Sequence, residues 1–438
     1  MMRCSLGFSV PQRLLHLGYN LLLPVVLLLG VGPWLLKMSK RGGLSMRLLE
    51  RVAIYDDEAE FALGGVVYVH AVSVGEVMVA LKLIRAWQGI YPNERFLLVP
   101  TTSTGYDVAL RMAPANVSVV YSPVDLPCVI RRVLKRFEPK QIVLMESELW
   151  PNLLVEARRA GVPVSVANAR LSERSESRYT KFAWASAGYF ALFNRFAVQE
   201  SRDVARWRGI GVPAEAIEVT GSVKFDQQGA DAVEAINEAF QEMLSGLSSG
   251  KRVVMALSTH AGEEALIGEA CIDLEEVFYV VVPRHAERRA EVKLELEQLG
   301  YEVVLRSELE QVGGSRPACL VIDSTGEMRD WVALADLAIV GKSFIGKGGQ
   351  NPCEAIAASV PVIVGPAMNN FEPLVSMLHE RSAIFLAQAS VASLRSTVSV
   401  ALQDRAQSEA MVSRAQAVLS AHDGATLRTV EALRIGSS

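Results

Sequence analysis

The sequence predicts an α/β protein in which two doubly wound domains follow an N-terminal apolar helix. The chain has 438 residues, which is too many for one compact core. Short β-branched runs alternate with amphipathic segments from about residue 60 onward, and the alternation begins again near Lys251. Strands regularly separated by helices form mostly parallel sheets. We therefore expect an N-terminal membrane segment over 1–40, a first domain over 41–226 and a second domain over 227–438.

The N-terminal segment is apolar and carries no formal charge from Leu14 to Leu36. About 20 apolar residues in a helix span the core of a bilayer. A cluster of basic residues follows the run, which places the downstream chain in the cytoplasm. These residues are Lys37, Lys40, Arg41, Arg47 and Arg51.

Three interpretations of this segment compete. The length of the run and the position of its basic flank argue against a cleaved signal peptide. A buried helix of the globular domain stays open, because Pro24, Gly30 and Gly32 weaken a spanning helix. The preferred interpretation is a retained anchor, or a helix lying partly in the membrane interface.

In the first domain, six short runs read as strands and a helix is expected over Glu76–Trp87. The expected strands are Val66–Val72, Phe96–Thr101, Gln141–Met145, Val162–Ala167, Arg195–Gln199 and Ile217–Thr220. The second domain repeats the pattern after a boundary near Lys224–Gln228, and its last forty or so residues are Ala-rich and helix-forming. Its expected strands are Val253–Leu257, Phe278–Val282, Glu302–Leu305, Leu320–Ile322, Leu337–Val340 and Val360–Val364. Ligands of such sheets bind beyond the carboxyl ends of the strands.

The amino-acid composition of the chain argues against some classes of function. The chain is 50% hydrophobic and 21% charged, with a formal net charge of −4, so nucleic acid is not expected as its main partner. Its five cysteines are scattered and form no C-x-x-C pair, and its six histidines form no H-x-x-x-H pair. We therefore expect neither a disulfide framework nor a structural metal.

Glu76 is the first candidate for chemistry. The segment Ser73-Val74-Gly75-Glu76 follows an expected strand and has the spacing of a capping box, in which Glu76 accepts from the Ser73 amide. The competing interpretation is a general base, because transfer to a hydroxyl requires a carboxylate within hydrogen-bond reach. A helix N-terminus favours the ionised form of such a base.

Two further carboxylates, Glu146 and Glu148, directly follow the strand Gln141–Met145. Acidic residues at the end of a strand often serve only to solvate a loop. However, the neighbouring Trp150 and Pro151 suggest a loop with a defined conformation. Arg170 ends the next strand and supplies a nearby cation. Acidic and basic residues at adjacent strand ends are typical of a cleft.

Several segments suit a phosphorylated ligand. Lys224 lies at the expected hinge and can contact a carboxylate or a phosphate, or be a solvated linker charge. Arg284 follows a strand and can bind phosphate through two hydrogen bonds, or lie in a surface turn. The segments Ser324–Glu327 and Gly348–Glu354 each begin a helix whose amides can receive a phosphate, and Glu354 can bind ribose hydroxyls.

Read together, these segments closely resemble the bacterial 3-deoxy-D-manno-octulosonic acid (Kdo) transferases, which are inverting enzymes of the GT-B fold. The resemblance extends from His70 to Phe371, and several of its motifs are rare combinations. In chain order the motifs are HAVSVGE, TTSTGYD, ESELWPN, ANARLSERS, TGSVKFD, STHAGEE, VPRH-x-ER, DSTGEM and GGQNPCEA. The family implies two Rossmann-like domains that face a central cleft.

The resemblance also implies roles for individual residues. Glu76 matches the proton acceptor, which favours the catalytic interpretation over the cap alone, and Glu146 and Lys224 match positions that stabilise the transition state. The positions that match the CMP-binding segments are Arg284, His285, Thr325, Gly326, Glu327, Asn351, Pro352, Cys353 and Glu354. Where the family commonly has GGHNPLE, this chain carries Gln350 and Cys353 in place of the His and the Leu.

The implied reaction moves Kdo from CMP-Kdo to a lipid A precursor in the cytoplasmic leaflet of the cell inner membrane, without a metal or another cofactor. Two alternatives stay open at this stage. One is a GT-B transferase that uses a nucleotide sugar on a different lipid or glycan. The other is a catalytically silent, membrane-tethered binding protein that has kept the fold.

Overall fold

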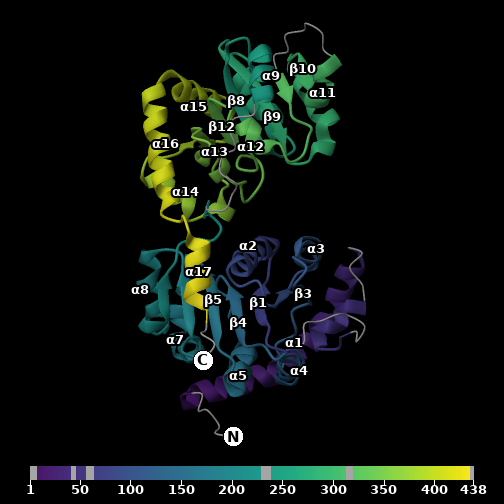
Figure 1. Ribbon diagram of the computed structural model, residues 1–438, viewed down its shortest axis with the longest axis vertical. Helices are drawn as coiled ribbons and strands as arrows, with labels where there is room; N and C mark the ends of the chain where they lie inside the picture. Colours follow the sequence, from purple (N-terminus) through teal and green to yellow (C-terminus); the bar gives the residue numbers. More distant parts are fainter. Residues whose placement is uncertain (1–6, 41–45, 56–63, 228–237, 312–318, 435–438) are drawn as a thin grey trace. The chain divides into compact units, whose positions relative to one another are not determined.

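A computed structural model of the chain describes residues 7–40, 46–55, 64–227, 238–311 and 319–434. The chain forms two compact units (Figure 1). Unit 1 consists of Met1–Asp226 and His422–Ser438, and unit 2 consists of Gln227–Ala421. Each unit contains a seven-stranded sheet whose neighbouring strands are all parallel, so the predicted α/β class with two doubly wound domains is confirmed.

The sheet of unit 1 has the order β3-β2-β1-β4-β5-β6-β7. The order reverses between β1 and β4, which pair directly from Val67↔Gln141 to His70↔Leu144. In a doubly wound sheet, the crevice beyond the carboxyl ends of two such strands is where ligands bind. The strands are β1 Val67–Ala71, β2 Phe96–Pro100, β3 Val117–Val119, β4 Gln141–Met145, β5 Val164–Ala169, β6 Arg195–Val198 and β7 Ile217–Val219.

Helices cover both faces of this sheet. One apolar layer joins the sheet to α4, α5, α7 and α8, and the other joins it to α2, α3 and α17. The helices are α1 Val10–Lys40, η1 Met46–Val52, α2 Val74–Ile90, α3 Ser103–Met112, α4 Pro127–Phe137, α5 Pro151–Ala160, α6 Glu173–Lys181, α7 Ala183–Phe190, α8 Ser201–Gly209, η2 Ala214–Ala216 and α17 Ala425–Leu433.

The sheet of unit 2 has the order β10-β11-β9-β8-β12-β13-β14 and reverses between β8 and β12. Its strands are β8 Arg252–Thr259, β9 Val277–Pro283, β10 Val303–Leu305, β11 Cys319–Val321, β12 Leu337–Val340, β13 Val362–Val364 and β14 Phe385–Leu386. Its helices are α9 Glu238–Ser248, α10 Glu263–Cys271, η3 Ala286–Arg288, α11 Arg289–Gln298, η4 Arg306–Gln311, α12 Met328–Val332, α13 Cys353–Ala357, η5 Asn369–Phe371, α14 Leu374–Glu380, α15 Val391–Gln403 and α16 Arg405–Ser420.

The C-terminus differs from the expected division at 227–438. The chain does pass into unit 2 after Asp226, but it returns to unit 1 at His422 (yellow α17 in Figure 1). The buried Asp226 carboxylate accepts hydrogen bonds from the backbone N–H groups of Gly424 at 2.9 Å and Thr426 at 2.7 Å. Val430 and Leu433 are fully buried in the core of unit 1. These contacts explain why residues 422–438 belong to the first unit.

The N-terminal helix also differs from the separate segment expected over 1–40. By length and composition, Val10–Gly30 is long and apolar enough to cross a membrane, with a mean hydropathy of 1.5. However, the first half of α1 packs along α7 within unit 1. The polar contacts that hold it there are described below.

Candidate active site

The predicted catalytic glutamate, Glu76, lies in the first turn of α2, directly beyond the carboxyl end of β1. The capping box is formed, because the Ser73 Oγ accepts from the Glu76 N–H at 3.2 Å and Glu76 Oε1 accepts from the Ser73 N–H at 3.3 Å. The carboxylate also accepts from the Ser73 Oγ–H at 2.9 Å and from the Val72 N–H at 2.8 Å. The capping and catalytic interpretations are therefore compatible, since the cap holds a nearly buried carboxylate in one place.

Glu146 and Glu148 join Glu76 to form a cluster of three carboxyl groups in unit 1. Burial raises the pKa of Glu146, and the charge of Glu76 raises it further. Burial, followed by the charges of Glu76 and Glu146, raises the pKa of Glu148 to about 7. A carboxyl group that titrates near neutrality beside an anchored carboxylate is typical of an acid–base site.

Two cations lie near this cluster. Arg170 and Lys224 both counter the rise in the pKa of Glu146, so the structure brings Lys224 to the predicted carboxylates. The three predicted catalytic residues, Glu76, Glu146 and Lys224, thus gather in unit 1 although they are far apart in the chain. Their chemical roles stay predictions.

Asn168 is a positioning residue that sequence reasoning did not single out. It lies in β5 with a positive φ of 53°, and its side-chain Oδ1 accepts from the Val223 N–H at 3.0 Å. The Lys82 Nζ donates to the carbonyl of Val223 at 3.0 Å. Together these bonds fix the backbone directly before Lys224. The signal available in the sequence was an amide residue at a strand end, a position that tolerates the left-handed conformation.

In unit 2, a cavity of about 330 Å³ collects four of the predicted nucleotide-binding residues. Arg284 comes from the end of β9, Thr325 and Gly326 from the loop before α12, and Glu354 from α13. Gly326 has a φ of +90°, which favours glycine and lets the loop turn there. A cavity of this size with a few convergent polar groups suits a small ligand.

The charges around Glu354 show how this cavity is organised. Burial raises the pKa of Glu354, while the guanidinium of Arg329, a hydrogen bond from Asn351 and the charge of Arg284 act in the opposite direction. Arg329 also lines the cavity but was not predicted. Asn351 accepts from the Cys353 N–H at 3.0 Å, which fixes the start of α13. Two arginines beside one carboxylate suit a ligand that carries both a phosphate and hydroxyl groups.

Not every predicted residue lines the cavity. His285 is half exposed and lies 3.7 Å from Glu287, and the Cys353 side chain is buried. The Glu327 carboxylate accepts from the Ser324 Oγ–H at 2.5 Å and from the Trp331 Nε1–H at 3.2 Å. The structure therefore shows Glu327 and Asn351 in bonds that shape their loops.

The glycines at 348 and 349 have a structural explanation of their own. A side chain at Gly348 would collide with Asn370, and one at Gly349 would collide with Met368. The close packing of these two loops accounts for both glycines without a phosphate. Gln350, which replaces the family's histidine, lies 3.1 Å from the Nε2 of His260.

The residues that the structure describes contain no group of three or more His, Cys, Asp or Glu side chains arranged to hold a metal ion. This finding concerns the described ranges alone.

Known proteins match this chain over most of its length. Residues 46–227 match the family of 3-deoxy-D-manno-octulosonic-acid transferases (kdotransferases). A 3-deoxy-D-manno-octulosonic acid transferase of Bordetella pertussis is 34% identical over 91% of this chain and 94% of its own length. The enzyme of the same name from Haemophilus influenzae is 30% identical over 89% of this chain and 91% of its own length.

Among solved structures, the UDP-GlcNAc 2-epimerase of Neisseria meningitidis has a TM-score of 0.53 at 13% identity. The match covers 84% of this chain and 99% of the epimerase, and it supports the GT-B fold alone. The sequence identity of 30% and 34% to the two transferases, over about nine tenths of this chain, also shows its family. The chain belongs to the 3-deoxy-D-manno-octulosonic acid transferase family, a family of glycosyltransferases that act in lipopolysaccharide synthesis.

Proposed function

We propose that this protein transfers Kdo from CMP-Kdo to a lipid A precursor (lipid IVA), with inversion at the anomeric carbon. The observation that carries the proposal is the anchored carboxylate of Glu76 beside Glu146, Glu148 and Lys224. Family membership supports the sugar, and the cavity around Arg284 and Glu354 supports a nucleotide donor.

In the proposed step, an acceptor hydroxyl oxygen forms a bond to the anomeric carbon of Kdo. The bond from that carbon to the CMP phosphate oxygen breaks, and its electron pair leaves with the phosphate. Glu76 takes the hydroxyl proton as general base. Lys224 stabilises the transition state together with Glu146, while Arg284 and the loop amides at Thr325 and Gly326 stabilise the departing phosphate.

The first test is transfer of labelled Kdo from CMP-Kdo to a tetraacyl lipid A precursor in detergent, with products resolved by mass. The expected product is heavier by one or more Kdo units. A folded protein that binds CMP yet forms no such product contradicts the proposed acceptor.

Glu76→Ala tests the mechanism. We expect a loss of transfer of about 10²–10⁴-fold, the usual contribution of a general base, with CMP affinity unchanged because the nucleotide cavity lies in unit 2. The matched control is Glu215→Ala, an exposed glutamate of the same unit, which should transfer Kdo normally. Unchanged turnover in Glu76→Ala excludes the proposed base.

The proposed chemistry uses no metal and no cofactor. Treatment with EDTA should therefore leave the rate of transfer unchanged, measured with and without added Mg²⁺. A rate that EDTA abolishes and Mg²⁺ restores contradicts this part of the proposal.

The proposed place of action is the cytoplasmic side of the cell inner membrane, where the lipid acceptor is available. The exposed apolar surface of α1 supports membrane attachment. The expected result is sedimentation of the full chain with membranes after a high-salt wash.

A further inference from the structure

We propose that α1 lies flat against the cytoplasmic leaflet and does not cross the bilayer. The inference rests on the membrane attachment proposed above and specifies its geometry. It follows from a simple relation: a helix that crosses a membrane has its two ends on opposite sides. In this protein, the N-terminal half of α1 and the segment η1 that follows α1 both contact the rest of unit 1.

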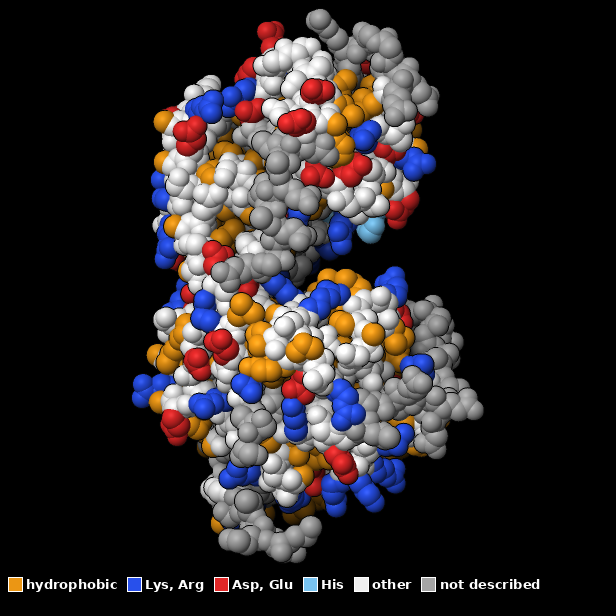
Figure 2. All heavy atoms as spheres, in the orientation of Figure 1, with side chains coloured by type: hydrophobic (Ala, Val, Ile, Leu, Met, Phe, Trp, Pro, Cys, Tyr) orange, Lys and Arg blue, Asp and Glu red, His pale blue; other side chains and the backbone are white. Residues whose placement is uncertain are grey.

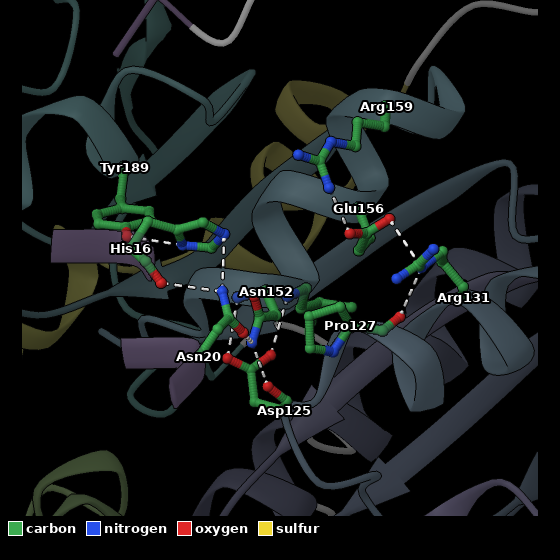
Figure 3. A network of polar contacts seen from close by, with 10 residues as sticks. His16, Asn20, Asp125, Pro127, Arg131, Asn152, Glu156, Arg159 and Tyr189 are labelled. Atoms are coloured by element: carbon green, nitrogen blue, oxygen red, sulfur yellow. Dashed lines mark hydrogen bonds and ion pairs between the residues drawn. The ribbon is translucent and has the colours of Figure 1, made fainter. Parts of the chain in front are cut away.

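The N-terminal half of α1 is docked on unit 1 by a row of polar side chains (Figure 3). Gln12 donates to the carbonyl of Trp184 at 3.1 Å, and His16 Nδ1 lies 3.0 Å from the Tyr189 hydroxyl. Tyr19 donates to the Asp125 carboxylate at 3.0 Å. Positions 12, 16, 19 and 20 share one face of a helix.

These contacts complete a buried network at the start of α5. The Asp125 carboxylate also accepts from the backbone N–H groups of Asn152 and Leu153, both at 2.9 Å. The fully buried Asn152 side chain donates to Asn20 Oδ1 at 2.8 Å. Lifting α1 away would remove the hydrogen bonds that Asp125 and Asn152 make with Tyr19 and Asn20. The docked position is therefore stable and specific.

The chain contacts unit 1 again shortly after the C-terminal end of α1. Lys40 ends the helix, and η1 begins at Met46. Arg51 donates to the carbonyl of Thr101 at 2.6 Å, and Glu50 accepts from the Tyr121 N–H at 2.8 Å. The six steps from Lys40 to Met46 extend at most about 22 Å, whereas the hydrocarbon core of a bilayer is about 30 Å thick. The segment between Lys40 and Met46 is therefore too short to cross the bilayer a second time and return the chain to unit 1.

The face of α1 that points away from unit 1 is apolar. This is the reverse of a helix on a water-facing surface, where the polar side chains face out. A continuous exposed apolar surface is typical of an interaction site. The exposed side chains are Leu14, Leu17, Leu21, Leu22, Val25, Val26, Leu28 and Leu29, each more than half exposed.

Aromatic residues extend this surface. Trp184, whose carbonyl accepts the hydrogen bond from Gln12, has a side chain that is 59% exposed, and Phe182 is 50% exposed. Tryptophan side chains favour the headgroup level of a membrane, and the exposed Phe182 ring adds apolar surface.

Basic residues beside α1 identify the lipid as anionic. Arg131 and Arg159 lie at the edge of the docking network, on α4 and α5 (Figure 3). Both are exposed, and Lys and Arg side chains gather over this end of unit 1 (Figure 2). Lys and Arg side chains near an anionic leaflet strengthen binding to it. The exposed basic residues of the two helices are Arg131, Arg132, Lys135, Arg158 and Arg159.

Cysteine labelling in cells tests the topology. Cys4 and Cys128 are replaced by Ser, and Cys271, Cys319 and Cys353 are buried. Ser9→Cys then places an exposed thiol just before α1. Intact spheroplasts are treated with a membrane-impermeant maleimide, and a second sample is treated after permeabilisation. Ser413→Cys, exposed on α16 of unit 2, is the matched cytoplasmic control.

For a flat helix, Ser9→Cys should react only after permeabilisation, as Ser413→Cys does, while the protein still sediments with membranes. Labelling of Ser9→Cys in intact spheroplasts, with Ser413→Cys unlabelled, places the N-terminus in the periplasm and overturns the proposal. The readout does not depend on Kdo transfer, so failure of the topology and failure of the proposed function are distinguishable.

Flotation with vesicles tests the choice of lipid. The full chain, diluted from detergent, should float more with phosphatidylcholine vesicles that contain phosphatidylglycerol than with phosphatidylcholine alone. The Arg131→Gln, Arg132→Gln, Lys135→Gln variant should lose this preference. Equal flotation of the unchanged chain with both vesicles contradicts an anionic surface.

Discussion

At the scale of single residues, the carboxyl group of Glu148 makes the stability of unit 1 depend on pH. Its folded pKa of about 7 lies above the unfolded value of 4.5, so the folded protein favours the neutral form. The stability that this group contributes is complete below pH 4.5 and is lost as the pH rises through 7. Above neutrality, the native state must hold an ionised carboxylate beside Glu76 and Glu146.

Glu148→Gln should therefore raise the free energy of unfolding at pH 8 and change it little at pH 5. We expect a gain of about 1–2 kcal/mol at pH 8, because partial exposure of the side chain screens the full effect of the shift. Thermal unfolding at both pH values measures it. Glu215→Gln is the control, and equal effects of the two variants at pH 8 contradict the prediction.

At the scale of secondary structure elements, Asp125 connects α1 to the first turn of α5. Asp125→Ala would leave the Tyr19 hydroxyl and the N–H groups of Asn152 and Leu153 without their acceptor. We expect the free energy of unfolding to fall by about 2–4 kcal/mol, the combined effect of a lost cap and buried unpaired donors. Chemical denaturation at neutral pH measures it.

Tyr19→Phe is the matched control, because it removes a single hydrogen bond from the α1 side. Its expected cost is about 0.5–1.5 kcal/mol. If the two variants unfold alike, Asp125 does not support α5 as described.

The sequence predicted strands well because each buried parallel strand reads as one β-branched run. Every expected strand is present, and β4 and β12 have the expected bounds. Two strands were missed, Val117–Val119, which has Ser118 at its centre, and Phe385–Leu386, which has two residues, neither of them buried. Neither strand forms an uninterrupted β-branched run. Helix α17 was assigned to the wrong unit because its contact with Asp226 spans about 200 residues of sequence.

The part of the candidate site whose residues follow neighbouring strands could be predicted from the sequence. Glu76 and Glu146 follow β1 and β4, which are neighbours at the point of reversal, so a parallel sheet brings them together. Arg329 was missed because its approach to Glu354 depends on the rotation of α12, which no strand pattern encodes. The hydrogen bonds from Ser324 and Trp331 to Glu327 also depend on how the loop and α12 are oriented, so the sequence did not predict them.

At the scale of the whole molecule, the two units differ in continuity, which predicts different behaviour of their fragments. Unit 2 is one continuous segment, Gln227–Ala421, with its own core and cavity. We expect the fragment 227–421 to fold and to bind CMP with the Kd of the full chain, as measured by calorimetry. A fragment that folds without binding CMP contradicts the assignment of the cavity.

Unit 1 instead requires two distant segments. The fragment 1–226 lacks the fully buried Val430 and Leu433, so it should melt at a lower temperature than unit 1 of the full chain. Attaching residues 422–438 after Asp226 through a flexible linker should restore the melting temperature. No recovery on attachment contradicts the role of α17 in this core.

The return of α17 to unit 1 also has a consequence for synthesis on the ribosome. Between Asp226 and His422 lie the 195 residues from Gln227 to Ala421, which take about 10–40 s to translate at 5–20 residues per second. During that interval the nascent unit 1 has a sheet face without its last helix, while unit 2 is still being completed. The domain encoded first therefore finishes folding last, and the α1 surface has time to reach the membrane before the enzyme is complete.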